Sequence, residues 1–85
     1  MPFVYIVECA DGSLYTGWAV DVAQRVKTHN AGRGARYTRM HGPVKLVYAE
    51  EQPNRVTAMQ RELEIKRWPR EKKLKLIRDQ IIGDQ

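Results

Sequence analysis

Two short runs of strand-forming residues open the chain and predict a β-hairpin. Valine, tyrosine, isoleucine and threonine dominate these runs, which together span residues 4–17, and such residues favour strands. Asp11-Gly12 lies between the runs, and this dipeptide is a strong signal for a tight turn. The pattern therefore predicts adjacent strands that carry Tyr5 and Tyr15.

The length of the turn decides which face of the sheet each tyrosine occupies. A two-residue turn would place Tyr5 and Tyr15 on opposite faces, since side chains alternate along a strand. A three-residue loop ending in a left-handed Gly12 puts both on one face and sets Gly17 opposite Tyr5. We favour this second register, because a glycine opposite Tyr5 leaves room for a bulky partner.

Helical periodicity and capping residues divide the rest of the chain. Asp21 is a good N-cap for a helix over residues 22–29, in which two valines one turn apart form the apolar stripe. Further on, the pattern predicts a strand over residues 44–50 and helices over residues 55–67 and 70–81. The order β-β-α-β-α-α indicates an α+β domain with helices flanking a small, three-stranded, mainly antiparallel sheet.

The segment over residues 30–43 is predicted to be a flexible, cationic loop. It holds three glycines, one tyrosine and four basic side chains, counting a histidine when it is protonated. Such a loop suits nucleic acid, because basic side chains contact phosphates and an aromatic ring stacks on a base or sugar. The candidate contacts are Arg33, Arg36, Tyr37, Arg39 and, just beyond the loop, Lys45. The alternative is a solvated basic turn.

Composition narrows the setting. The 85 residues allow one domain with one core, spanning residues 1–85. The net charge of +5 favours an anionic partner such as nucleic acid. The single cysteine, Cys9, excludes an internal disulfide and a cysteine zinc site, and we expect it to pack as a small apolar group. Apolar runs are too short for a membrane span and no signal-type start is seen, so we expect a cytoplasmic protein without a membrane partner.

Glu62 stands out within the predicted helix over residues 55–67. Its helical neighbours at i−4, i−3 and i+3 are all apolar, namely Ala58, Met59 and Ile65. This places the Glu62 carboxylate on the buried stripe, whereas Glu64 belongs to the solvated face. A buried carboxylate is costly unless a cation compensates it. That cation is either a basic side chain such as Arg25 or a metal ion, and the sequence leaves both open.

Five short segments occur in order along the chain: Phe3 to Gly17, Arg25 with His29, Ala35-Arg36-Tyr37-Thr38-Arg39, Pro43-Val44-Lys45-Leu46-Val47-Tyr48 and Ala58-Met59-Gln60-Arg61-Glu62. Together they resemble the GIY-YIG nuclease superfamily, and in particular its short, single-domain bacterial members. The resemblance implies metal-dependent cleavage of DNA phosphodiesters, as in homing endonucleases, restriction enzymes and repair incision proteins. It also implies that the active-site positions are occupied by Tyr5, Tyr15, Arg25, His29 and Glu62.

The implied residues suit phosphodiester hydrolysis. Mg²⁺ (or Mn²⁺) on Glu62 would polarise the phosphate and the leaving oxygen, and Arg25 would clamp the non-bridging oxygens. A tyrosine near a metal and a guanidinium would have its pKa lowered toward use as a general base. Tyr5 is assigned this role and Tyr15 orients water or phosphate, although the two roles are interchangeable. His29 shares the proton transfer or holds the phosphate, or alternatively caps the last carbonyls of its helix.

The sequence therefore predicts an endonuclease-like domain that acts on DNA, with branched and single-stranded forms as candidate substrates and with no small-molecule cofactor. So small a domain has little surface for reading bases, which favours selection by DNA structure or strand state. The alternative is a catalytically weak nucleic-acid-binding or adaptor module that keeps the fold. Phe3 in place of the family's glycine and the lack of an asparagine after Glu62 favour the alternative, whereas the tyrosines, Arg25 and Glu62 favour the enzyme.

Overall fold

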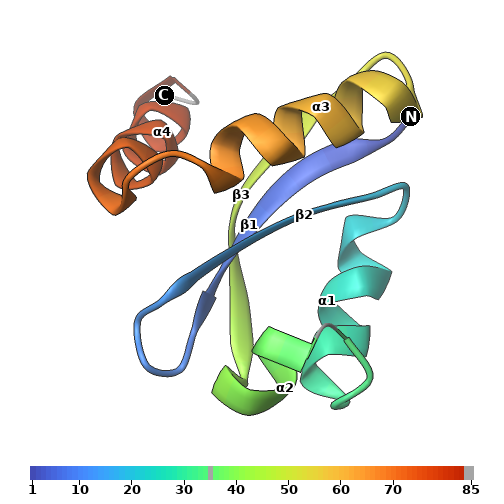
Figure 1. Cartoon of the computed structure of the whole chain (residues 1–85), viewed down its shortest axis with the longest axis vertical. Helices are drawn as coiled ribbons and strands as arrows, with labels where there is room; N and C mark the ends of the chain where they lie inside the picture. The colour runs from blue at the N-terminus through green and yellow to red at the C-terminus, as the bar shows by residue number, and fades with distance from the viewer. Residues whose placement is uncertain (35, 84–85) are drawn as a thin grey trace.

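The structure, a computed structural model, describes residues 1–34 and 36–83, apart from the side chains of residue 39 and of residues 81–83. Two strands, two helices, a third strand and two further helices follow one another along the chain (Figure 1). They are β1 (Phe3–Cys9), β2 (Leu14–Ala19), α1 (Val22–Asn30), α2 (Arg36–His41), β3 (Val44–Glu51), α3 (Arg55–Lys66) and α4 (Arg70–Gly83). Among the described residues, none of the helices has the length and apolar character needed to cross a bilayer.

β1 is the central strand of a sheet with the order β2-β1-β3, and both neighbours run antiparallel to it. The predicted α+β class and three-stranded sheet are thereby confirmed. The hairpin has the three-residue loop, because the Gly12 N–H donates to the Cys9 carbonyl at 2.9 Å and Gly12 adopts a φ of +86°. Tyr5 therefore pairs with Gly17, and Tyr15 lies on the same face of the sheet as Tyr5, as predicted.

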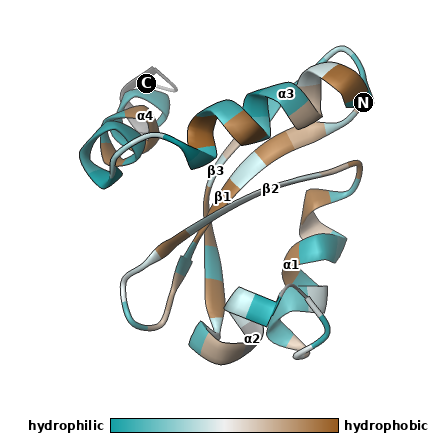
Figure 2. Cartoon of the chain, in the orientation of Figure 1, coloured by the Kyte–Doolittle hydropathy of each residue, from teal (hydrophilic) through white to brown (hydrophobic). Residues whose placement is uncertain are grey.

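The helices cover both faces of the sheet. α3 and α4 pack on one face, where the core consists of Val4, Ile6, Tyr48, Ala58 and Ile65 with the partly buried Leu14, Trp18, Val47, Trp68, Leu76 and Ile77. α1 packs on the opposite face with α2 beside it, and the core there consists of Tyr5, Val7, Cys9, Ala19 and Val44 with the partly buried Tyr15, Val22, Val26 and Ala49. Hydrophobic residues recur between hydrophilic ones on α1, α3 and α4, as expected for amphipathic helices (Figure 2). Cys9 packs as a small apolar group, as predicted.

α2 corrects the prediction of a loop over residues 30–43. This helix of six residues, Arg36–His41, is too short to be stable by itself. Contacts with the rest of the chain hold the segment in place. The Asn30 side chain accepts a hydrogen bond from the Val44 N–H at 2.7 Å and donates one to the Val44 carbonyl at 3.1 Å. Thr38 on α2 is fully buried, with its Oγ1 2.7 Å from Nδ1 of His29.

A charged cluster fixes α3 against β3. Nε of Arg61 on α3 lies 3.0 Å from an oxygen of Glu50 on β3, and both side chains are partly buried. The same guanidinium lies over the ring of Trp68, 5.1 Å from its centroid, and pairs with the exposed Glu64. Glu64 is therefore on the solvated face, as predicted. The pair of Arg61 and Glu50 thus joins β3 to α3, the helix that carries Glu62.

Candidate active site

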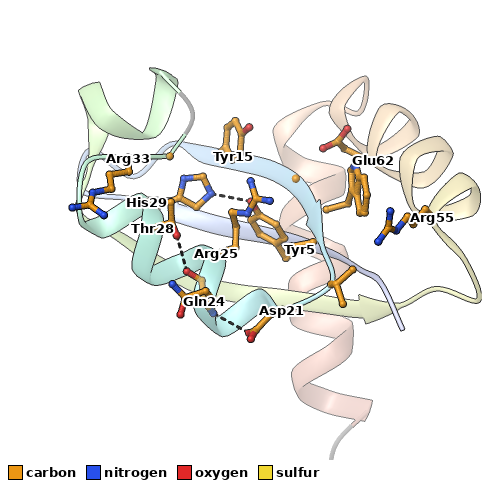
Figure 3. Close-up of a pocket in the computed structure, with 15 residues that line it drawn as sticks. Tyr5, Tyr15, Asp21, Gln24, Arg25, Thr28, His29, Arg33, Arg55 and Glu62 are labelled. Carbon is orange, nitrogen blue, oxygen red and sulfur yellow. Dashed lines mark hydrogen bonds between the residues drawn. The ribbon is translucent and has the colours of Figure 1, made fainter.

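A cleft of about 970 Å³ lies between α1 and α3, across the edge strand β2. All five predicted catalytic residues line it, namely Tyr5, Tyr15, Arg25, His29 and Glu62. Figure 3 shows Arg25 and His29 on the α1 side and Glu62 on the α3 side, with the two tyrosines between them. The structure thus brings the five side chains together at one concave surface, whereas their catalytic roles stay predictions.

Gly17 makes room for Tyr5 at the floor of the cleft. A Cβ atom built on Gly17 would lie 2.5 Å from Oη and 2.7 Å from Cζ of Tyr5. Real Cβ atoms essentially never come so close to another heavy atom, so any side chain here would displace the tyrosine. The space left by the glycine is thus filled by the ring of Tyr5 itself. Without a side chain at residue 17, the Tyr5 hydroxyl reaches across β2 toward α1.

Hydrogen bonds join Tyr5 to His29 and His29 to α2. Oη of Tyr5 lies 2.9 Å from Nε2 of His29, and Nδ1 of the same ring lies 2.7 Å from Oγ1 of Thr38. His29 is only 3% exposed, and the Tyr15 ring meets its edge with centroids 5.6 Å apart. Both ring nitrogens are therefore engaged away from the end of α1. The alternative that His29 merely caps the last carbonyls of its helix is wrong.

Burial shifts the pKa values of three ionisable groups in the cleft, namely Tyr5, Tyr15 and His29. Burial raises the pKa of the Tyr5 hydroxyl well above its ordinary value, and the nearby Tyr15 adds to the rise, outweighing Arg25. Burial, then the charge of Glu62, also raises the pKa of Tyr15. Burial and the charge of Arg25 lower the pKa of His29, so the imidazole is neutral at pH 7. Among the chain's own groups, desolvation outweighs the guanidinium of Arg25 at both tyrosines, and the lowering expected beside a bound metal stays a prediction.

Glu62 lies at the border between the core and the cleft. Ala58 and Ile65 are fully buried, but Met59 is 49% exposed, so the apolar stripe of α3 is narrower than the sequence suggested. The Glu62 side chain is 17% exposed and forms an ion pair with Lys66 one turn later, at 3.8 Å. Among the described ion pairs, its partner is therefore Lys66 and not Arg25. The carboxylate points into the cleft on the wall opposite Arg25 (Figure 3).

Two cations on α3 were missed by the sequence-based reasoning. Arg55 lines the cleft on the α3 side (Figure 3). Lys66 lies over the ring of Tyr15, with Nζ 5.6 Å from the centroid, and so touches two cleft residues. Both could have been found from helical spacing, since Arg55 is seven residues before Glu62 and Lys66 is four after it, which places all three on one side of a helix.

The predicted nucleic-acid contacts are only partly gathered at the cleft. Arg33 lines the cleft, whereas Arg36 on α2 and Lys45 on β3 are exposed outside its described lining. Tyr37 is exposed but already stacked on His41, with centroids 4.2 Å apart, and lies 6.0 Å from the Tyr15 ring in a near-parallel orientation. The side chain of Arg39 lies outside the described residues. The basic segment is therefore a surface beside the cleft more than a part of it.

The donor set of the cleft suits a divalent cation only in company with a substrate. Within the described part of the chain, no three histidine, cysteine, aspartate or glutamate side chains cluster as metal ligands. Asp21 also lines the cleft, but it caps α1 by accepting the Gln24 N–H at 3.0 Å. Glu62 remains as the carboxylate available for a metal. Mg²⁺ is commonly held by one or two carboxylates, waters and substrate phosphates, so Glu62 fits it.

Two tyrosines, a neutral histidine, a glutamate and several arginines thus share one open cleft of a small α+β domain. The family model described as the GIY-YIG catalytic domain matches residues 1–75, and the chain belongs to this family. Membership of this nuclease-type family implies a nucleic acid as the substrate.

Relatives and solved structures agree with this assignment. The chain is 56% identical over 77 residues to a UPF0213 protein of Staphylococcus aureus strain Mu3, covering 91% of this chain and 94% of the relative. It resembles the solution structure of the UPF0213 protein BH0048 from Bacillus halodurans, with 47% identity, a TM-score of 0.57 and coverage of 91% and 83%. It also resembles the solution structure of the E. faecalis protein EF2693, with 30% identity, a TM-score of 0.62 and coverage of 94% and 85%.

Proposed function

We propose that this protein is a metal-dependent endonuclease that hydrolyses phosphodiester bonds of DNA. The observation that carries the proposal is the hydrogen bond between Tyr5 and a neutral His29 in the same cleft as Arg25 and Glu62. A proton acceptor, a phosphate-binding guanidinium and a metal-binding carboxylate are what hydrolysis of a phosphodiester requires. Membership of the GIY-YIG family supports the same reaction.

In this proposal the proton of the attacking water leaves through Tyr5. Tyr5 accepts it on Oη while its own proton moves to Nε2 of His29, so the high pKa of Tyr5 is no obstacle, because no free phenolate accumulates. The water oxygen bonds to phosphorus and the bond to the leaving sugar oxygen breaks. That oxygen takes a proton from solvent, and His29 later returns its proton to solvent. Tyr15 orients the water or the phosphate.

Groups on both walls of the cleft neutralise the negative charge of the phosphate. Arg25 binds the non-bridging oxygens, and Arg33 and Arg55 bind the neighbouring phosphates of the strand. Glu62 would hold Mg²⁺ (or Mn²⁺), which when bound supplies charge neutralisation at the phosphate and the leaving oxygen. These groups contact the backbone of the nucleic acid, and backbone contacts carry no sequence information. We therefore propose selection of branched or single-stranded DNA by structure rather than by a long sequence, without a small-molecule cofactor.

The decisive experiment compares Glu62→Gln with Glu64→Gln in nicking of supercoiled and branched DNA, with Mg²⁺ and with EDTA. Both residues lie on α3, but Glu64 faces solvent outside the cleft. Glu62→Gln should lower cleavage on the order of a hundredfold or more, as expected for loss of metal and charge stabilisation, and Glu64→Gln should leave it unchanged. Equal rates for the two variants would contradict the role of Glu62.

The thermal midpoint of Glu62→Gln gives a second, independent result. The ion pair with Lys66 joins two residues one turn apart on one helix, and pairs of that kind contribute only about 0.3–0.5 kcal/mol. The midpoint without metal should therefore hardly change, while the stabilisation that Mg²⁺ gives to the wild type in the presence of DNA should be lost. A large drop without metal would show that Glu62 is a structural residue.

A second candidate, a nucleic-acid-binding module without efficient cleavage, is favoured by the engagement of the cleft carboxylate Glu62 with Lys66. Replacement of Arg33, Arg36 and Arg39 by alanine tests binding in either case. Affinity should fall for all sequences, and the slope of log affinity against log salt should flatten by roughly one unit for each phosphate that is no longer neutralised. An unchanged slope would move the binding surface elsewhere. Tight binding without nicking by the wild type would favour the module.

A further inference from the structure

Thr38 is buried beside the proton acceptor of the proposed reaction, although it does not line the cleft. It belongs to α2, it is fully buried, and its Oγ1 lies 2.7 Å from Nδ1 of His29. The opposite ring nitrogen of His29 faces the Tyr5 hydroxyl at 2.9 Å. The three side chains thus form one line from the floor of the cleft to α2, with the imidazole in the middle.

Gly34 lets the chain close over the imidazole before α2 begins. A Cβ atom on Gly34 would lie 2.0 Å from Nδ1 and 2.9 Å from Cα of His29. Because the second of these atoms belongs to the backbone, no movement of the ring alone could relieve the contact. The chain therefore passes close to His29 at Gly34, just before α2, and this close passage brings α2 against the imidazole ring.

We propose that Thr38 is a positioning residue that accepts the Nδ1–H of His29 and so leaves Nε2 free to take the proton of Tyr5. Its role in the reaction rests on the proposed function, whereas its effect on the histidine tautomer does not. A neutral imidazole has one donor nitrogen and one acceptor nitrogen, and the partner of one nitrogen decides which tautomer is present.

The relative acidity of the Tyr5 and Thr38 hydroxyls decides which way the two hydrogen bonds to His29 are donated. A phenol is a far stronger acid than an aliphatic alcohol, so it is the better hydrogen-bond donor and the poorer acceptor. Tyr5 is protonated, since burial raises its pKa. The arrangement with Tyr5 donating to Nε2, and Nδ1–H donating to Thr38, places each hydroxyl in its better role. The reverse tautomer would point a proton at Tyr5 and block the transfer.

The charged and titratable groups around His29 do not replace Thr38. Arg25, one turn earlier on α1, acts on the imidazole only by its charge and opposes protonation. Tyr15 from β2 meets the ring with its edge at 68°. Once Tyr5 has passed its proton to Nε2, the imidazolium keeps its Nδ1–H bonded to Thr38, as a buried partner keeps the histidine of a serine protease in the productive tautomer.

The test reads the tautomer of His29 directly, by NMR of ¹⁵N-histidine-labelled protein at pH 8. The background is His41→Gln, because Nδ1 of His41 already donates to the Tyr37 carbonyl at 2.8 Å and would give the same signal. His29 should show the Nδ1–H tautomer. Thr38→Val, which removes the hydroxyl at nearly constant volume, should shift the population toward Nε2–H, and Thr38→Ser should restore Nδ1–H. If His29 shows the Nε2–H tautomer in the His41→Gln protein with Thr38 intact, the proposal is overturned.

Nicking assays then test the consequence. Thr38→Val should lower kcat on the order of tenfold to a hundredfold, with DNA affinity unchanged, and Thr38→Ser should stay within a few-fold of the wild type. Thr16→Val is the matched control, because Thr16 is equally buried but its hydroxyl has no hydrogen-bond partner among the described residues. An unaltered tautomer in Thr38→Val, or equal kcat losses in the Thr38 and Thr16 variants, would refute the proposal. Nδ1–H in a protein that never nicks DNA would refute only the proposed function.

Discussion

Replacement of Gly17 by alanine should disconnect Tyr5 from His29. The added Cβ would lie 2.5 Å from Oη, 2.7 Å from Cζ and 3.1 Å from Cε1 of Tyr5. An ordinary contact begins at 3.4 Å, so the tyrosine hydroxyl must retreat by about 1 Å, and in a close-packed interior this strains the neighbours. The distance from Oη to Nε2 is now 2.9 Å. A retreat of that size takes it beyond hydrogen-bonding range.

Two costs add in this variant. Overpacking of a well-packed core costs about 1–3 kcal/mol, and a buried polar group left without its partner costs about 1–3 kcal/mol. Together they predict a destabilisation of about 2–6 kcal/mol, a large part of the 5–15 kcal/mol that stabilises an ordinary domain. A misplacement of about 1 Å at the reacting groups also costs about a hundredfold in rate.

Urea unfolding and DNA nicking measure the two effects, with Gly12→Ala as the control. Gly12 has open space around it, but its φ of +86° disfavours a side chain, so that variant should be destabilised by about 1–2 kcal/mol and keep its activity. Adding Tyr5→Phe to Gly17→Ala removes the closest clash and should recover part of the stability but none of the nicking. If Gly17→Ala unfolds and nicks like the wild type, the proposed seating of Tyr5 is refuted.

Three further predictions concern charge and protonation. Lys66→Gln removes the cation beside Glu62, so with DNA present Mg²⁺ should raise the thermal midpoint at lower concentrations than in the wild type. An unchanged Mg²⁺ dependence would show that Lys66 does not compete. In a spectrophotometric titration, Tyr48 should ionise with a pKa of about 12. Tyr5 should ionise at a still higher pH, so Tyr5→Phe should remove the last ionisation step. In the unfolded wild type, that step should return to the ordinary pKa range of tyrosine. The pKa of His29 is lowered from 6.5 in the folded protein, so as the pH falls the unfolded chain takes up a proton on this histidine before the folded chain does. The free energy of unfolding should therefore decrease as the pH drops below 6.5. In His29→Gln this decrease should be smaller.

Local chemistry was sufficient to predict the hairpin and its register. Asp11 and Gly12 fix the turn, and alternation along the strands then determines that Tyr5 and Tyr15 share a face. The strands and the three longer helices also follow from periodicity and capping, since Asp21 accepts the Gln24 N–H as an N-cap does. These features depend on residues close together in sequence, which is why the pattern alone reveals them.

The parts that the sequence did not reveal depend on distant residues. α2 is held by Asn30 against Val44 and by Thr38 against His29, contacts that join residues 14 and nine positions apart. The apolar stripe of α3 was predicted too wide, because Met59 is about half exposed and only the structure reveals which apolar positions of the helix meet the core. The rise that burial gives to the pKa of Tyr5 was not foreseen, since the cost of burying a phenolate appears only when the surrounding core is known.

The two walls of the cleft differ in how firmly they are built, and this difference bears on how a substrate would be received. On the α1 side, His29 is held by buried hydrogen bonds on both nitrogens, so under the proposed function the proton acceptor is fixed before DNA arrives. On the α3 side, the ion-pair partner of Glu62 among the described residues is the partly exposed ammonium of Lys66, although the helix itself is joined to β3 through Arg61 and Glu50. A single carboxylate binds Mg²⁺ weakly, so under the proposed function the phosphate must contribute ligands and the metal enters together with the DNA. Mg²⁺ should then raise the affinity for DNA, and DNA should raise the affinity for Mg²⁺ by the same factor, since binding free energies coupled through one site are reciprocal.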